Sequence, residues 1–168
     1  MSEAVRIQLT QGKVTFVDAA DAPALLVYRW FAMKNRRHWC AGRNAPKQNG
    51  KRGTIYMHRQ LMGFPVLEVD HKDHNGLNNR RSNLRLATDL QQAANRWNPR
   101  NRVGYRGVIK RLRKWVPHCF EARINVNRKY RKLGYFKSAK LAALAYDKAA
   151  REIFGEFAVL NFAKSAAS

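Results

Sequence analysis

Acidic residues and cysteines are both scarce in this chain of 168 residues. Eleven Asp and Glu stand against 33 Lys and Arg, so the formal net charge at pH 7 is +22. A field of that strength favours a polyanionic partner. The two cysteines, Cys40 and Cys119, form no CxxC pair, which excludes a zinc ribbon and argues against a disulfide scaffold.

Long apolar runs are also missing, as is the basic and then apolar pattern of a signal peptide. These absences argue against a membrane span and against secretion, so we expect a soluble protein in a reducing cytoplasm. Hydrophobic residues nevertheless make up 45% of the chain and aromatic residues 11%. This content excludes a disordered basic tail and suffices for one domain or two small ones.

The first 35 residues carry a strand pattern and then a helix pattern. Alternating apolar and polar residues predict a hairpin with strands at residues 4–9 and 13–17. Asp21 is the predicted N-cap of an amphipathic helix that reaches Met33.

Turn-forming residues dominate 44–53, which predicts a loop able to contact a phosphate backbone, and a short strand is expected at 54–57. Further strands are predicted at 66–70 and 83–87. A capping box at Thr88 begins a helix that extends to about Trp97.

A polar, basic stretch at residues 98–103 predicts a linker to a second unit. In that unit we expect three strands, at 104–110, 120–126 and 130–136, and a helix capped by Ser138. The predicted fold is therefore α+β, and its last part is a three-stranded antiparallel sheet packed on one helix.

Residues 69–85 concentrate two His, two Asp and four Asn. Hydrolysis of a phosphodiester bond needs an activated water, a cation on the phosphate and a frame that fixes both, and this stretch supplies suitable groups for all three. The structural alternative is a turn-rich loop that only satisfies backbone groups. A zinc site is a second alternative, with ligands drawn from His38, Cys40, His58, His71 and His74.

Asp70-His71, with Asn83-Leu84-Arg85 following and then an Asn-bearing helix, resembles the HNH nuclease motif over about residues 54–97. The preceding residues, including Tyr28-Arg29-Trp30 and His58-Arg59, are similar to the N-terminal region of phage HNH homing endonucleases. The resemblance implies a nuclease unit at residues 1–97 with a ββα-metal core at about 66–97.

The resemblance also implies that His71 is the general base, that Asp70 binds the metal and that Asn83 orients His71. The implied cofactor is one divalent cation, Mg²⁺ with Mn²⁺ as a substitute, because hard cations prefer oxygen ligands. Where the family has a second metal ligand, an Asn, this sequence has Gln92, and Asn95 one helical turn later is a substitute. Because neighbours on a strand point to opposite faces, we expect a twist or bulge at Asp70 and His71.

Tyr105-Arg106-Gly107-Val108, Glu121-Ala122-Arg123-Ile124, Leu133-Gly134-Tyr135-Phe136 and the segment Ala142–Ala150 recur in an order that resembles the DNA-binding domain of plant ethylene-response factors. The resemblance implies a DNA-binding domain at 104–168 whose sheet enters the major groove. It implies base or phosphate contacts from Arg106, Trp115, Glu121 and Arg123, and leaves phosphate contacts to Arg111, Arg113, Arg128, Arg131 and Lys132. Ile109 and Lys132 replace an Arg and a Trp of those factors.

Together these patterns predict a metal-dependent, site-directed DNA endonuclease of phage homing type that nicks double-stranded DNA in the bacterial cytoplasm. With one HNH centre per chain we expect a monomer on DNA, and a dimer stays open. The alternative is a sequence-specific DNA-binding protein whose nuclease unit is weakened by Gln92. Binding to RNA is disfavoured because a sheet does not fit the A-form major groove.

Overall fold

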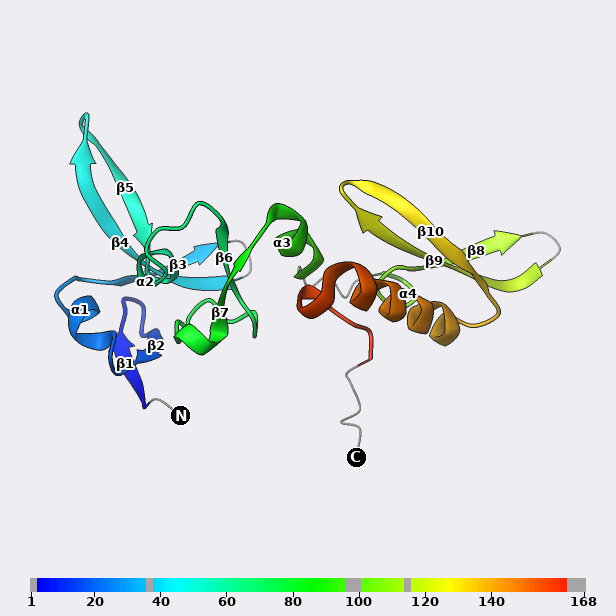
Figure 1. The fold of residues 1–168 in the computed structure, drawn as a ribbon, viewed down its shortest axis with the longest axis horizontal. Helices are drawn as coiled ribbons and strands as arrows, with labels where there is room; N and C mark the ends of the chain where they lie inside the picture. Colours follow the sequence, from blue (N-terminus) through cyan, green and yellow to red (C-terminus); the bar gives the residue numbers. More distant parts are fainter. Residues whose placement is uncertain (1–2, 36–37, 96–100, 114–115, 163–168) are drawn as a thin grey trace. The chain divides into compact units, whose positions relative to one another are not determined.

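The computed structural model describes residues 3–35, 38–95, 101–113 and 116–162. Contacts between residues divide the chain into two compact units, Met1–Thr88 and Asp89–Ser168. Both are built from small antiparallel sheets with few helices (Figure 1), so the predicted α+β class is confirmed in outline. Within the described ranges no helix is long and apolar enough to cross a membrane.

The first unit opens with the predicted hairpin, formed by β1 (Ala4–Gln8) and β2 (Val14–Asp18). Two apolar side chains of this hairpin, Ile7 and Val17, pack in one core with residues of later elements. These residues include Leu25, Met57, Val69 and Leu84. The core therefore links the N-terminal hairpin to β6 (Glu68–His71) and β7 (Leu84–Ala87), the strands that carry the candidate site.

The predicted helix from Asp21 to Met33 is correct only in its first turn. Helix α1 (Ala22–Leu26) is followed by strand β3 (Phe31–Asn35), not by further helix. The buried indole of Trp30 donates a hydrogen bond to Leu25 O (2.8 Å), which occupies a carbonyl at the helix end. The helical spacing of the apolar residues arose here from a helix end and a strand that share one core.

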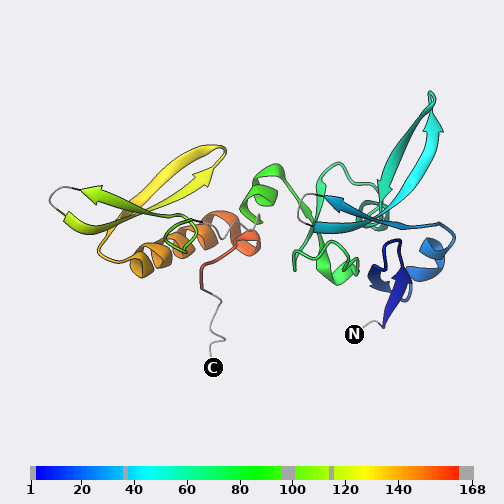
Figure 2. The ribbon, with the colours of Figure 1, turned by 180° about the vertical axis from the view of Figure 1, so that it is seen from behind.

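The predicted loop at 44–53 is wrong as well, because these residues form the end of a long hairpin. Strands β4 (His38–Gln48) and β5 (Lys51–Tyr56) pair around Asn49 and Gly50, both of which have positive φ. A two-residue loop of this kind matches the twist of the strands. Both views show the β4–β5 hairpin extending away from the other elements of its unit (Figure 1 and Figure 2).

A short helix, α2 (Met57–Leu61), leads from β5 to the hairpin that carries the candidate site. That hairpin consists of β6 (Glu68–His71) and β7 (Leu84–Ala87), preceded by a 3-10 turn at Arg81–Asn83. Of the expected twist or bulge at Asp70 and His71, the bulge is absent, since the pairing runs without a shift to His71 opposite Leu84, where the strand ends.

The second unit contains a three-stranded sheet and a helix, as predicted, but its first strand begins at Val108 and not at Gly104, and its second begins at Val116 and not at Phe120. Its elements are α3 (Asp89–Asn95), β8 (Val108–Arg113), β9 (Val116–Val126), β10 (Lys129–Phe136), α4 (Ala139–Phe154) and a 3-10 turn at Gly155–Phe157. The sheet order is β10-β9-β8, and the Ser138 side chain accepts from Leu141 N (3.2 Å), as a helix cap should. Buried Val108 and Ala122 pack with Ala142 and Ala143 of α4.

The sequence predicted the boundary after residue 97, whereas the contacts place α3 with the second unit. Ala94 and Asn95 on α3 are buried, and Arg106 donates to Ala94 O at 2.8 Å. The predicted linker at 98–103 and Trp97 lie largely outside the described residues.

Candidate active site

The end of β6 presents two adjacent ionisable side chains to different surroundings. Asp70 pairs with Arg85 of β7 (Oδ2 to Nε, 3.0 Å), and both side chains are largely buried. His71 instead contacts Asn79 and His58. β6 and its pairing with β7 both end at His71, so strict strand alternation no longer fixes which way its side chain points relative to Asp70. The different contacts of the two side chains suit separate roles for the two groups better than two ligands on one ion.

His71 is held as a neutral base. Its Nε2 lies 3.1 Å from Asn79 Oδ1, and its ring meets the edge of His58 with 5.1 Å between centroids. Burial lowers the pKa of His71, against the opposing effects of the Asn79 hydrogen bond and of the charges on Asp73 and Asp70. A neutral imidazole is the form that can accept a proton.

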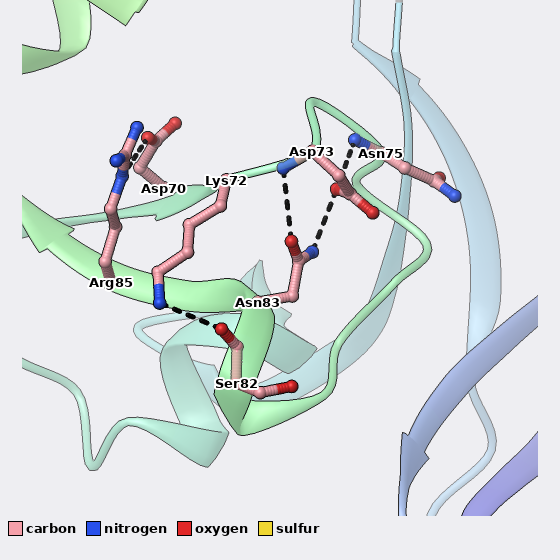
Figure 3. A network of polar contacts seen from close by, with 7 residues as sticks. All are labelled: Asp70, Lys72, Asp73, Asn75, Ser82, Asn83 and Arg85. Atoms are coloured by element: carbon pink, nitrogen blue, oxygen red, sulfur yellow. Dashed lines mark hydrogen bonds and ion pairs between the residues drawn. The ribbon is translucent and has the colours of Figure 1, made fainter. Parts of the chain in front are cut away.

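The loop after His71 is stabilised by its own polar side chains, and Asn83 is their centre (Figure 3). Asn83 accepts from Asp73 N (3.1 Å) and donates to Asp73 Oδ1 (2.9 Å) and Asn78 O (2.8 Å). Asp73 also accepts from Asn75 N and Asn78 Nδ2. These hydrogen bonds outweigh partial burial, which acts in the other direction, and lower the pKa of Asp73. Asn83 thus shapes the loop, while Asn79 makes the contact with His71 that we predicted for Asn83.

The N-terminal hairpin fixes this loop from the other side, a role that the sequence did not suggest. Leu77 O accepts from Phe16 N (2.9 Å) and from Thr15 Oγ1 (2.7 Å), and Asn79 N donates to Phe16 O (2.7 Å). Thr15 and Asn79 are fully buried. A parallel bridge between Phe16 and Asn78 makes the loop a short neighbour of β2.

Two acidic residues hold the following turn. Asp18 accepts from Arg81 N (2.9 Å), and Asp21 forms two hydrogen bonds of 2.8 Å with the Arg81 guanidinium. Asp21 stands at the predicted N-cap of α1 but makes no side-chain cap there. Its carboxylate is used for the site loop instead.

His58, which the sequence suggested only as a ligand in the zinc alternative, is a second buried imidazole at the site. It stacks on Tyr56 (5.4 Å between centroids) and touches His71, and its Nδ1 is buried without a hydrogen-bond partner in the described residues. Burial, followed by the charges of His71 and Arg59, lowers the pKa of His58 to about 3. His58 lies on α2 and His71 on β6, so only the three-dimensional fold shows that the two rings are in contact.

The remaining predicted metal ligands, Gln92 and Asn95, lie on α3 of the second unit. Their amide oxygens and the Asp70 carboxylate are the donor type that hard cations prefer, so the residues fit such an ion chemically. A cation on Asp70 would share the carboxylate with Arg85. The zinc alternative finds no support, because no three His, Cys, Asp or Glu in the described part cluster as metal ligands.

The face of the β8–β10 sheet opposite α4 carries several of the predicted DNA-binding residues. Strand alternation and register place on this outer face, among others, Arg111, Glu121, Arg123, Tyr130, Lys132 and Tyr135. Arg111 pairs with the buried Glu121 (Nε to Oε2, 2.8 Å), and Arg123 lies over the Tyr130 ring (4.2 Å from Cζ to centroid). The arginines are thereby held by neighbours on the same face.

Other predicted DNA contacts lie elsewhere. Arg106 donates to Tyr146 Oη (2.7 Å) and to Ala94 O, so its guanidinium is engaged inside the unit. Exposed Arg131 is paired in register with buried Ile124, which puts it on the α4 side, and exposed Arg128 lies in the β9–β10 turn. Side chains of Arg113 and Trp115 lie outside the described residues.

Comparisons with known proteins find sequence similarity to a nuclease and to a transcription factor. An HNH endonuclease of Acanthamoeba polyphaga mimivirus is 28% identical over 158 residues, which cover 90% of this chain and 76% of that protein. An ethylene-responsive transcription factor of Arabidopsis thaliana is 33% identical over 97 residues, 57% of this chain and 60% of that protein.

A family model described as HNH endonuclease matches residues 63–94. The matched range contains β6, the loop with Asn79 and Asn83, β7 and almost all of α3. The family model therefore matches the same elements that the hydrogen bonds identify. The chain therefore carries an HNH endonuclease domain, centred on the β6–β7 hairpin.

Proposed function

We propose that this protein is a metal-dependent, site-directed DNA endonuclease of homing type. The observation that carries the proposal is His71, a neutral imidazole at the end of β6 that is fixed by a fully buried amide. The HNH match covers the same residues.

In this proposal the His71 imidazole accepts a proton from the attacking water. Asp70 binds one divalent cation, Mg²⁺ or Mn²⁺ in its place, and Gln92 or Asn95 supplies an amide oxygen. When bound, the cation neutralises charge on the scissile phosphate and on the leaving oxygen. Asn83 and Asp73 keep the intervening loop in one conformation.

The substrate is double-stranded DNA. The outer face of the β8–β10 sheet supplies cations and planar groups of the kind that contact base edges and phosphates in a major groove. Tethering such a module to a small nuclease raises the concentration of the nuclease at one site. One catalytic centre per chain supports nicking of one strand by a monomer, in the cytoplasm of a phage-infected bacterium.

A plasmid-nicking assay in Mg²⁺ tests the proposal. The wild-type protein should convert supercoiled plasmid to the nicked form, and His71→Ala should abolish this while leaving the affinity for DNA unchanged. His74→Ala, in the same loop, is the matched control and should retain cleavage. Cleavage that survives in His71→Ala would contradict the assigned base.

The second candidate is a sequence-specific DNA-binding protein with an inactive nuclease unit. The Asp70–Arg85 ion pair favours it, because a guanidinium already neutralises the carboxylate assigned to the cation. Gln92 points the same way, since its arm is one methylene longer than that of Asn. Specific DNA binding without nicking in Mg²⁺ or Mn²⁺ would establish this candidate over the first.

A further inference from the structure

A chain of hydrogen bonds connects the candidate base to the N-terminal hairpin. Thr15 Oγ1 donates to Leu77 O at 2.7 Å; Met57 Sδ, the other acceptor in reach, is much farther away at 4.0 Å. With its proton committed, the hydroxyl oxygen accepts from Asn79 Nδ2 at 2.8 Å. Asn79 Nδ2 also points to Gly76 O at 3.5 Å.

These contacts fix which way the Asn79 amide faces. A backbone carbonyl only accepts, so the side of Asn79 that faces Gly76 O must be the NH₂ group. If the amide were reversed, Asn79 Oδ1 would face Gly76 O, and both atoms are acceptors. It would also need a hydrogen bond from the Thr15 hydroxyl, which already donates to Leu77 O. Asn79 Oδ1 is therefore the atom that faces His71 Nε2, at 3.1 Å.

An amide oxygen cannot donate, so Nε2 must carry the hydrogen in the neutral imidazole. We infer that Thr15 and Asn79 are positioning residues that hold His71 as its Nε2–H tautomer and leave Nδ1 as the basic nitrogen. The His71 Nδ1 has no hydrogen-bond partner among the described residues, and it is not one of their buried unpartnered atoms.

Burial makes this selection strong. Thr15 and Asn79 have no exposed surface, so water cannot replace either hydrogen bond. A buried amide or hydroxyl that loses its partner keeps the full cost of desolvation. Leu77 O and Asn79 N also form hydrogen bonds with the backbone of Phe16. These bonds fix the loop that carries Asn79 against β2, the strand that carries Thr15.

The inference gives a role to a hairpin that ends more than fifty residues before His71 in sequence. It rests on the proposed function for its catalytic meaning, because only a general base needs one tautomer. The tautomer itself exists whether or not the protein cuts DNA. A spectroscopic measurement of the His71 tautomer therefore tests the positioning role separately from the proposed nuclease function.

The test uses the full chain with ring ¹⁵N-labelled histidine, and His71→Gln identifies the resonances of His71. The wild-type protein should show the pattern of a neutral imidazole protonated at Nε2. A spectrum with the proton on Nδ1 overturns the inference directly. If the expected tautomer is present and no DNA is cut, the proposed function fails while the positioning role stands.

Two variants of Thr15 separate the hydroxyl from its shape. Thr15→Val keeps the volume and removes the hydrogen bonds, and should mix the His71 tautomers and lower kcat about tenfold, the loss expected for one buried hydrogen bond. Thr15→Ser keeps the hydroxyl, and should retain both one tautomer and kcat within about twofold. Equal tautomers and rates in Val and Ser variants would refute the role of Thr15. Asn79→Ala provides the second variant should Thr15→Val not fold.

Discussion

At the scale of single residues, the site is defined by buried groups whose protonation is fixed by their neighbours. His58 is the clearest case, since it stacks on Tyr56 and keeps an unpartnered ring nitrogen against the candidate base. A buried imidazole without a partner is held neutral, so His58 adds no positive charge beside His71 near neutral pH.

The low pKa of His58, about 3 against an ordinary value of 6.5, predicts a pH dependence of stability. Between these values the unfolded chain binds a proton that the folded state does not, so the free energy of unfolding falls as pH falls through this window. Replacing His58 by Phe should reduce that slope by about 1.4 kcal/mol per pH unit. Urea unfolding at a series of pH values measures it, and an unchanged acid slope would contradict the burial of this ring.

Gln92 is the residue at which the sequence departs from the HNH motif. Its longer arm displaces an amide oxygen by about a bond length, enough to disturb the geometry of a catalytic cation. Gln92→Asn should therefore raise kcat by about tenfold in Mg²⁺, measured by plasmid nicking under single-turnover conditions. Gln91→Asn on the same helix is the matched control and should give no gain. Equal rates in both variants and the wild type would show that the arm length at Gln92 does not limit the enzyme.

At the scale of elements, local sequence patterns predicted the strands, hairpins and helix cap whose contacts are between residues close in sequence. The β1–β2 hairpin, the β6 and β7 strands, the three strands of the second unit and the Ser138 cap all follow from alternation or capping. The helix expected up to Met33 failed because Trp30 and Leu25 belong to one core but to different elements. The ends of β4 and β5 were missed because their residues beside the Asn49-Gly50 turn are polar and turn-forming, a composition that also predicts a loop.

The candidate site divides in the same way. Asp70, His71 and Asn83 are close in sequence and carried by a motif, so the sequence alone identifies them. Thr15 and His58 come from other elements, and no local pattern distinguishes a threonine on an inward strand face from any other. Their roles depend on long-range packing that only the fold reveals.

The packing of α4 against the sheet yields a stability prediction at this scale. Gly107 has φ +73°, and a Cβ there would clash with two ring carbons of Tyr146. Gly107→Ala should destabilise the second unit by at least about 3 kcal/mol, because backbone strain and overpacking add. Gly104 also has positive φ but has nothing within 4 Å of such an atom, so Gly104→Ala should cost about 1 kcal/mol. Denaturant unfolding compares the two, and equal losses would contradict the close packing at Tyr146.

At the scale of the whole molecule, positive charge is the dominant property, and it is not confined to the second unit. No acid occurs between Asp21 and Glu68. Within this stretch, every residue from 46 to 54 of the β4–β5 hairpin is exposed, including Lys47, Lys51 and Arg52. A two-stranded ribbon is narrow enough to enter a DNA groove, so this hairpin is expected to contact phosphates as well.

Replacing Lys47, Lys51 and Arg52 together by Gln should therefore weaken DNA binding. The slope of log affinity against log salt should become shallower by about 2.7, since each lost phosphate contact contributes about 0.9. Fluorescence anisotropy over a range of NaCl concentrations measures it.

The control replaces Lys140, Lys148 and Arg151 by Gln, the same change in net charge on exposed positions of α4. It should leave the slope nearly unchanged, because α4 packs beneath the sheet and its cations lie on no predicted contact surface. If both triple variants lower the slope equally, only overall charge matters and the hairpin has no specific role.

In the proposed function, the inward hydrogen bonds of Arg106 limit which arginines can contact DNA bases. Its guanidinium serves Tyr146 and Ala94, so among the described arginines on the outer face, bidentate reading of guanine falls to Arg111 and Arg123. Each is already aimed by a neighbour, Glu121 or Tyr130. Selection from a randomised oligonucleotide pool should accordingly return a short consensus, with few invariant G·C pairs and tolerant flanks.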